Sequence, residues 1–290
     1  MNKRGLKRYL ILFALLISIA GVAVSGYKIL SIRTAYRDAE GEYADLRNLA
    51  APGAPDETSK PAPTPETISE IPAMNAAAAA KLRTPADIAR VASAAQTEVD
   101  APLPRIAMDF EPLYEINEDT VAWITIDDTR IDYPVVQGED NDVYLNRMFS
   151  GKSGFAGSIF MDYDNSPDFS DAHTVIFGHH LKDGSMFAGL TKFRDQAYFD
   201  EHPVMILHTP EGDYTVELFA AYVRDASAIP HDFDTDEDFL GYVDEIRGRS
   251  NIKSDVVIEA GDRILTLCTC SYAYDDARYV VHGKLVPIYD

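Results

Sequence analysis

Two cysteines placed close together are the residues of this chain most able to do chemistry. The 290-residue sequence contains 2 cysteines, Cys268 and Cys270, in the segment TLCTC. A cysteine thiolate is a nucleophile and a metal ligand. In an extended strand, residues two positions apart lie on one face about 6.5 Å apart, whereas a relaxed disulfide joins Cα atoms about 5.5 Å apart. A disulfide between the two cysteines would therefore be strained, and we expect both thiols to stay reduced.

The residues around the cysteines predict a hairpin that brings an arginine to Cys270. The segment GDRILTLCTC alternates like a strand, with Thr266, Cys268 and Cys270 on one face. A second strand, RYVVHGKLV, begins at Arg278 after a short loop. In an antiparallel pair, facing residues lie about 5 Å apart, so Cys270 and Arg278 are expected to be neighbours. A nearby cation lowers the pKa of a thiol, and a guanidinium can bind a developing oxyanion.

A thiol nucleophile also needs a group that carries protons, and the sequence offers a histidine pair for this role. In VIFGHHLKDGSMF an apolar run ends at Gly178, and His179 and His180 follow it. Residues at the ends of rigid strands are frequent catalytic residues.

Each of these signals also has a simpler interpretation. A buried cysteine is commonly an apolar filler, and a loop histidine or a strand-opening arginine is commonly a surface residue. The combination is what favours catalysis. Zinc binding is disfavoured, because the C-x-C spacing is too short for a zinc knuckle and no second cysteine pair exists.

Short β-rich runs must position these residues. They are separated by turn residues and predict a mainly antiparallel barrel or sandwich. The runs are VAWITI (121–126), IDYPVV (131–136), GSIFMDY (157–163), HTVIFGHH (173–180), VMILHT (204–209), DYTVELFAAYVRD (213–225), RILTLCTC (263–270) and RYVVHGKLVPIY (278–289). One helix is predicted within DTDEDFLGYVDEIRGRS (234–250), with Thr235 and Asp238 as a capping pair.

The N-terminus predicts a membrane anchor. Four basic residues in MNKRGLKR precede an uncharged apolar run from Tyr9 to Gly26. A spanning helix needs about 20 apolar residues, and positive flanks stay in the cytoplasm. A cleaved signal peptide is the alternative, because AVS before Gly26 resembles a cleavage site. In both cases the remaining chain lies outside the cytoplasm.

The rest of the chain divides into a stalk and a folded domain. Residues 31–49 are predicted to continue the anchor helix, residues 51–80 are rich in Ala and Pro and form a linker, and residues 85–96 form a short helix. The predicted parts are a cytoplasmic basic tail (1–8), a transmembrane signal-anchor (9–30), an extracellular stalk (31–104) and a folded domain (105–290). The formal net charge of -21 argues against nucleic acid as a partner.

On these residues the sequence resembles the sortases, cell-wall cysteine transpeptidases of Gram-positive bacteria. TLCTC matches the T-L-x-T-C signature of the family, RYVVHGKL matches its final strand with an arginine, and FGHHLKDGSMF resembles its Gly-His segment. The segment from Ala122 to Asn165 and the long helix before the TLCTC strand are similar to class B sortases in particular. The resemblance covers Phe110 to Ile288.

The resemblance implies a fold and a set of site residues. The fold would be mainly β, an eight-stranded sortase-type β-barrel with added helices, and residues 105–290 would be the catalytic domain. Cys270 would be the nucleophile, His179 the general acid and base, and Arg278 the oxyanion or substrate clamp. The predicted substrate-binding residues are Asn141, Leu145, Cys268 and Ser271. The sequence departs from the family pattern at Phe177, where tyrosine is frequent, and at Cys268 and Ser271.

The resemblance also implies a reaction. The enzyme would cleave a C-terminal sorting signal of the NPxTN or xPxTG type after Thr, form a thioacyl-enzyme, and pass the protein to the amine of a peptidoglycan precursor. Its partners would be surface proteins or pilins with such a signal, and no cofactor or metal is implied. The alternatives are a cysteine peptidase of the same fold that hydrolyses its target, and a non-catalytic surface-binding module suggested by the acidic exterior.

Overall fold

The computed structural model of this chain describes residues 3–50, 108–270 and 276–288. These residues belong to one compact unit. The predicted linker at 51–80 and the predicted helix at 85–96 lie outside the described residues, and so does Ser271. The backbone of Cys270 is described, but its side chain is not.

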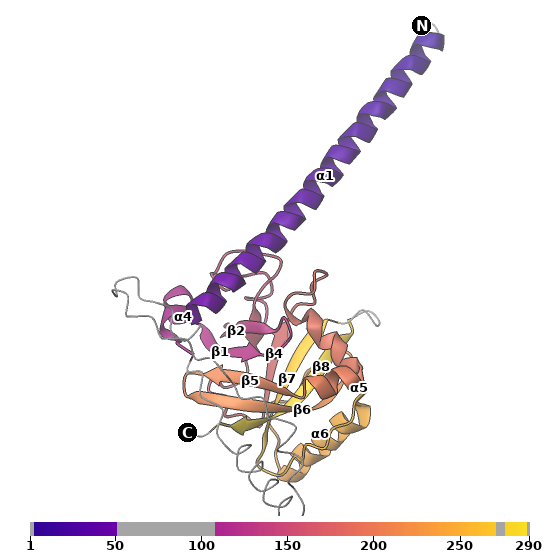
Figure 1. The fold of residues 1–290 in the computed structure, drawn as a ribbon. Coiled ribbons are helices and arrows are strands. Elements are labelled where there is room, and N and C mark those ends of the chain that lie inside the picture. The colour runs from indigo at the N-terminus through magenta and orange to yellow at the C-terminus, as the bar shows by residue number, and fades with distance from the viewer. Residues whose placement is uncertain (1–2, 51–107, 271–275, 289–290) are drawn as a thin grey trace, which may run out of the picture. The chain divides into compact units, whose positions relative to one another are not determined.

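Eight strands form a closed barrel, which confirms the predicted fold class (Figure 1). Around the barrel the strands follow the order β1-β2-β3-β4-β7-β8-β6-β5. Each strand overlaps one of the predicted runs, because alternating apolar residues between turn signals are a local pattern. The strands are β1 (Thr120–Thr125), β2 (Asp132–Gln137), β3 (Ile159–Met161), β4 (His173–Gly178), β5 (Val204–Thr209), β6 (Gly212–Arg224), β7 (Arg263–Cys270) and β8 (Arg278–Pro287).

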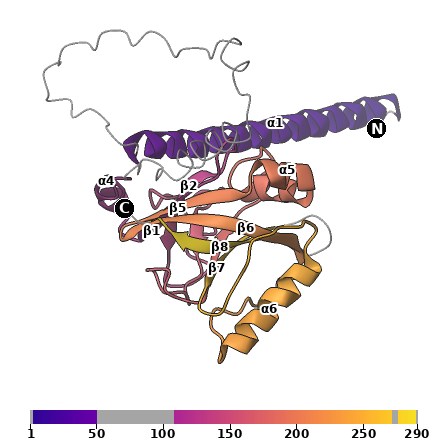
Figure 2. The same cartoon turned by 60° about the horizontal axis from the view of Figure 1, so that its bottom comes forward.

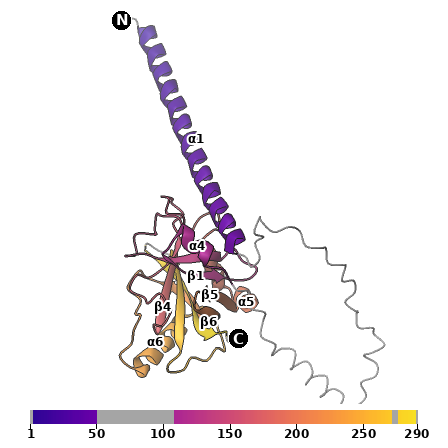
Figure 3. The same cartoon turned by 90° about the vertical axis from the view of Figure 1, so that its left-hand side faces the viewer.

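Helix α6 (Asp236–Arg249) confirms the predicted long helix before β7. Thr235 caps it, because its side-chain oxygen accepts from the Asp238 amide at 3.1 Å. The buried residues Phe239, Val243 and Ile246 form one apolar stripe that packs against the outer face of the barrel (Figure 2 and Figure 3).

Three shorter helices are not predicted by the sequence. They are α4 (Glu111–Ile116), the 3-10 helix η1 (Phe187–Arg194) and α5 (Gln196–Glu201). Segments of this length span fewer than three turns, so they carry too little periodicity to be recognised.

Two hydrophobic cores lie on opposite faces of strand β7. Leu265 and Leu267 belong to the core inside the barrel. Ile264 and Cys268 belong to the second core, between the barrel and α6. The predicted alternation of the TLCTC strand is therefore confirmed, and Cys268 points to the α6 side of the sheet.

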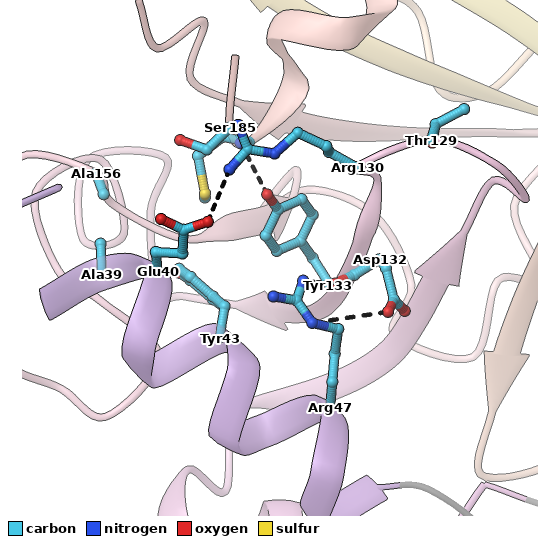
Figure 4. A pocket seen from close by; sticks show the side chains of 11 residues that line it. Ala39, Glu40, Tyr43, Arg47, Thr129, Arg130, Asp132, Tyr133, Ala156 and Ser185 are labelled. Atoms are coloured by element: carbon cyan, nitrogen blue, oxygen red, sulfur yellow. Dashed lines mark hydrogen bonds and ion pairs between the residues drawn. The ribbon is translucent and has the colours of Figure 1, made fainter. Parts of the chain in front are cut away.

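Helix α1 (Lys3–Ala50) confirms that residues 31–49 continue a helix from the N-terminus. Its last turns pack on the barrel, and Tyr43 and Leu46 are buried there. The Tyr43 hydroxyl donates to the Gly157 carbonyl oxygen at 2.8 Å. Two ion pairs flank this contact (Figure 4): Arg130–Glu40 at 3.2 Å and Arg47–Asp132 at 3.9 Å.

The predicted anchor at residues 9–30 falls in the first part of α1. Within the part of the chain that the structure describes, none of the helices combines the length and apolarity that a membrane span requires. Of the predicted span, the side chains of residues 9–12, 14, 16 and 17 lie outside that part.

Candidate active site

Backbone pairing brings the three predicted catalytic positions into one row. Strand β4 pairs with β7 in parallel, with Gly178 opposite Thr269, so the next residue along each strand is His179 on one and Cys270 on the other. Strand β7 pairs with β8 in antiparallel register, with Cys270 opposite Arg278. Neighbouring strands lie about 4.8 Å apart. The backbones of the three residues therefore stand side by side across β4, β7 and β8.

The hairpin confirms the predicted contact between the positions of Cys270 and Arg278. The neighbour on the other side, His179, comes from the parallel pairing of β4 with β7. That pairing joins two segments that are far apart in the chain, and nothing in the local sequence predicts it.

His179 directly follows β4 and is half-buried. Its Nε2 lies 2.6 Å from the Leu145 carbonyl oxygen. A carbonyl only accepts, so Nε2 carries the hydrogen, and in the neutral ring Nδ1 is left to exchange a proton. The next residue, His180, instead forms an isolated bridge with Met186.

Close packing explains why a glycine, Gly178, precedes His179. A Cβ at Gly178 would lie 2.5 Å from the Ile159 side chain and 2.7 Å from the Phe187 ring. Only glycine allows β4 to end this close to its neighbours. The Gly-His pair thus reflects how tightly the end of β4 is packed.

Arg278 opens β8 and is half-buried. It stands opposite Cys270 on one side and opposite Arg224 of β6 on the other. Its Nη1 donates to the Ala277 carbonyl oxygen at 3.2 Å. A guanidinium has five N–H donors, so Arg278 can keep this bond and still bind an oxyanion.

A groove with a volume of about 590 Å³ runs along this row. Five of the predicted site residues line it: Asn141, Leu145, His179, Cys268 and Arg278. The side chains of the other two, Cys270 and Ser271, lie outside the described residues. The groove is also lined by Phe160, Phe177, Asp162, His231 and the small residues of the loop Asp225–Ile229.

The predicted substrate-binding residues have different surroundings. The Asn141 side chain donates to Asp162 Oδ1 and accepts from the Tyr163 amide, both at 3.1 Å. Leu145 packs against the barrel core and orients His179 through its carbonyl. Cys268 is 3% exposed, at the floor of the groove. Substrate binding by these residues stays a prediction.

An acid–histidine pair in the groove is not predicted by the sequence. His231 Nε2 lies 3.4 Å from Asp162 Oδ2. Burial opposes ionisation of Asp162, but hydrogen bonds from His231, Asn141 and the Asp164 amide outweigh it and lower its pKa. The hydrogen bond to Asp162 raises the pKa of His231, against the smaller effect of burial. The local signal in the sequence is limited to Asp162 within the GSIFMDY run and Asp164 directly after it.

The same two residues belong to a cluster with the geometry of a cation site. The ligand atoms of Asp162, Asp164 and His231 lie within 4.8 Å of one another. Asp162 and His231 are already paired with each other, and exposed acids such as Asp164 often gather without a metal. We assign no metal to the cluster, and the prediction of a metal-free site stands untested.

The arrangement can support nucleophilic catalysis on a carbonyl group. It combines a cysteine position, a histidine whose Nδ1 can exchange protons, and an arginine that can bind developing negative charge. The groove is large enough to hold part of an extended peptide.

The part of this chain that is similar to known proteins contains most of the barrel and all of the residues that line the groove. Residues 124–286 match the family described as Sortase domain. Sortase B of Listeria monocytogenes is 41% identical over 182 residues, which are 61% of this chain and 74% of the relative. Sortase B of Staphylococcus aureus is 37% identical over 183 residues, 62% and 75% of the two chains. A solved Staphylococcus aureus sortase B–substrate complex superposes with a TM-score of 0.59 and 33% identity, covering 69% of this chain and 93% of that one.

Proposed function

The chain belongs to the sortase family, in its class B branch, and on this premise we propose that it is a membrane-anchored cysteine transpeptidase for proteins with a C-terminal sorting signal. Class B sortases are cysteine transpeptidases, so the chain is an enzyme of this kind. The proposal adds the signal, the acceptor and the anchor. The signal is of the NPxTN or xPxTG type, and the acceptor is the amine of a peptidoglycan precursor.

One observation carries the proposal: the positions of Cys270, His179 and Arg278 are adjacent across three neighbouring strands. In the first step His179 Nδ1 accepts the proton of the Cys270 thiol, the thiolate attacks the Thr carbonyl carbon of the signal, and the carbonyl electrons move to the oxygen. Arg278 binds this oxyanion. When the tetrahedral intermediate collapses, the C–N bond breaks, and His179 protonates the departing amine.

The second step regenerates the thiol. His179 removes a proton from the incoming amine, which attacks the thioacyl carbon and expels the Cys270 thiolate, and His179 then returns the proton to the sulfur. The product carries a new amide bond between the Thr carbonyl and the acceptor. Asn141, Leu145, Cys268 and Ser271 are proposed to line the binding site of the signal.

The anchor is the second part of the proposal. Sortases are cell-envelope enzymes. The basic residues before Tyr9 and the uncharged run up to Gly26 support an N-terminus in the cytoplasm and a catalytic domain outside the membrane. Residues 31–104 would then separate the catalytic domain from the bilayer.

A cleavage assay with the full-length chain in detergent micelles tests the reaction. The probes are quenched peptides with an NPxTN or an xPxTG signal, and triglycine is the amine acceptor. Cys270→Ala is expected to abolish cleavage and thioacyl formation. The matched variant Cys268→Ala should still form the thioacyl adduct and transfer it. Full cleavage by Cys270→Ala would overturn the proposal.

The same assay separates the two alternatives. Hydrolysis without any triglycine adduct would indicate a cysteine peptidase. Peptide binding that persists without cleavage, and that survives alkylation of Cys270, would indicate a non-catalytic binding module.

A further inference from the structure

A buried row of three polar side chains crosses the strands that carry the site. His173, Thr266 and His282 each have 0% of their surface exposed. His173 Nε2 lies 2.6 Å from Thr266 Oγ1, and Thr266 Oγ1 lies 2.6 Å from His282 Nδ1. His173 Nδ1 lies 2.7 Å from the Pro230 carbonyl oxygen. Buried polar groups of this kind need partners, and Thr266 serves both histidines.

The direction of every hydrogen bond in the row follows from its ends. The Pro230 carbonyl only accepts, so His173 Nδ1 carries a hydrogen. Burial keeps both histidines neutral, since it lowers the pKa of His173 to about 3 and the pKa of His282 well below its usual value. His173 Nε2 is then an acceptor, and the Thr266 hydroxyl donates to it. The Thr266 oxygen in turn accepts from His282 Nδ1–H.

The surroundings of His282 Nε2, at the other end of the row, agree with these hydrogen-bond directions. His282 Nε2 has no hydrogen-bond partner among the described residues. A neutral ring with its hydrogen on Nδ1 has only a lone pair at Nε2, which is the less costly group to leave unpaired. The positive groups facing the row are Arg224, which disfavours a charge on both histidines, and His231, which disfavours a charge on His173. The rings of Tyr222 and Tyr242 cover the two histidines.

The row joins the three strands that carry the catalytic positions. His173 opens β4, Thr266 lies in the middle of β7, and His282 lies opposite Thr266 on β8. His179 directly follows the end of β4, Cys270 ends β7, and Arg278 begins β8. The row lies on the α6 side of the sheet, where Figure 3 shows α6 near β4 and the rings of His173 and Tyr242 are 5.5 Å apart.

The row also reaches the loop that forms one wall of the groove. His173 contacts this loop twice, through the Pro230 carbonyl and through its own amide, which donates to the His231 carbonyl at 3.1 Å. Arg224 holds the other end of the loop through Ser227 and Ala228. The loop residues Asp225–Ile229 line the groove.

We propose that Thr266 is a positioning residue for the reaction: its hydroxyl ties β4, β7 and β8 together and holds His179, Cys270, Arg278 and the groove loop in their relative places. The inference rests on the proposed function for its activity readout. Thr266 touches no reacting atom, so its effect is expected on the rate of the chemical step more than on peptide binding.

The chain contains a matched control for this threonine. Thr174 is also fully buried in β4, one residue from His173, but its hydroxyl has no hydrogen-bond partner among the described residues. Valine replaces threonine with nearly the same shape. Thr266→Val removes a donor from His173 and an acceptor from His282, whereas Thr174→Val removes no bond.

The activity test uses the full-length chain in detergent micelles with a quenched sorting peptide and triglycine. Thr266→Val is expected to lower kcat about tenfold to a hundredfold, because small misplacements of catalytic groups are that costly. KM should change less than about threefold on the same reasoning. Thr266→Ser keeps the hydroxyl and should restore most of the rate, and Thr174→Val should behave as the unaltered chain. Wild-type kcat in Thr266→Val, or equal losses in Thr266→Ser or Thr174→Val, would overturn the inference.

A second readout does not depend on turnover. The rate of Cys270 alkylation, followed by peptide mapping across pH, reports the local field of Arg278 and His179 at the thiol. Thr266→Val should shift the midpoint of this profile, and Thr174→Val should not. If no peptide is cleaved by the unaltered chain, the proposed function fails, while the alkylation profiles still decide the role of Thr266.

A third measurement uses the unaltered chain, so it still tests the hydrogen-bonded row if Thr266→Val does not fold. Nitrogen-15 spectra of the histidine-labelled chain should show His173 and His282 neutral, with the hydrogen on Nδ1, from about pH 5 to pH 8. A hydrogen on Nε2 of either ring, or titration of either ring in this range, would contradict the row.

Discussion

Two arginines that open neighbouring strands show how position decides the role of a single residue. Arg263 opens β7 and Arg278 opens β8. Arg263 donates to the Phe169 carbonyl at 2.7 Å, at the end of β7 remote from Cys270. Arg278 stands opposite Cys270 and lines the groove. The same residue type therefore has a structural role at one end of β7 and a place in the candidate site at the other.

We predict that Arg278→Lys lowers kcat/KM for peptide cleavage about a hundredfold. Lysine keeps the charge but loses the planar set of donors that can bind the Ala277 carbonyl and an oxyanion together. Initial rates with the quenched sorting peptide measure the loss.

Arg263→Lys is the matched control for this substitution. It also replaces an arginine that opens a strand, but far from the groove, so its kcat/KM should stay within about threefold of the unaltered chain. Equal losses in the two variants would mean that Arg278 acts through stability and takes no part in catalysis.

At the scale of elements, the connection between β2 and β3 supports the histidine. Gly157 in this connection has a φ of 59°, and its carbonyl accepts from Tyr43 of α1. A Cβ at Gly157 would lie 2.6 Å from the Leu145 oxygen and 3.0 Å from His179 Cδ2. The Leu145 oxygen is the same atom that accepts from His179. Gly157 thus contacts both the end of α1 that packs on the barrel and the residues that set the orientation of His179.

We predict that Gly157→Ala lowers both stability and activity. The new methyl group would push on the Leu145 carbonyl and the His179 ring, and a positive φ costs a further 1 kcal/mol or so. We expect a loss of about 2–4 kcal/mol in the free energy of unfolding by denaturant, and a fall in kcat of at least about tenfold.

Gly151→Ala isolates the backbone contribution. Gly151 has a φ of 79°, but no atom lies within 4 Å of its added Cβ. This variant should lose only about 1 kcal/mol and keep its kcat. If the two alanine variants lose activity alike, contact with His179 is not the cause.

At the scale of the whole molecule, histidines with opposite pKa shifts shape the pH dependence of stability. Burial lowers the pKa of His173 and His282, so their contribution is complete above about pH 6.5 and is lost as pH falls toward their folded values. Pairing with Asp162 raises the pKa of His231, so its contribution is complete below about pH 6.5 and is lost as pH rises through the folded value. The lowered pKa of Asp162 adds stability above about pH 4, which is lost only in stronger acid.

We therefore predict a maximum in the free energy of unfolding near pH 6–7. On its acid side the two buried histidines should contribute a slope of about 1.4 kcal/mol per pH unit each. Denaturant unfolding at a series of pH values measures the curve. A flat profile between pH 4.5 and pH 6.5 would contradict neutral burial of His173 and His282.

His231→Gln tests the alkaline side of the same curve. The variant cannot be charged, so the stability that it loses relative to the unaltered chain should be largest near pH 5.5 and should shrink as pH rises past the pKa of His231. A difference that does not change with pH would mean that the pair with Asp162 acts only through packing.

The sequence by itself determined the local elements and the local part of the site. The eight strands, the capped helix α6 and the pairing of Cys270 with Arg278 all follow from alternation, capping residues and a short loop, which act between near neighbours in the chain. The short helices α4, η1 and α5 could not be predicted from the sequence, because so few turns show no clear periodicity of apolar residues.

Only the tertiary structure decided which distant segments meet. The parallel pairing of β4 with β7 put His179 beside Cys270, and the same pairing buried His173 against Thr266. The Asp162–His231 pair likewise joins the end of β3 to the loop after β6. The residue pattern within a strand does not depend on which other strand it pairs with, so the pattern cannot reveal that strand. Closure of the barrel buries the inner face of β7 and α6 covers the outer face. Together they select the partners, because each buried polar group is left only the neighbours that it finds there.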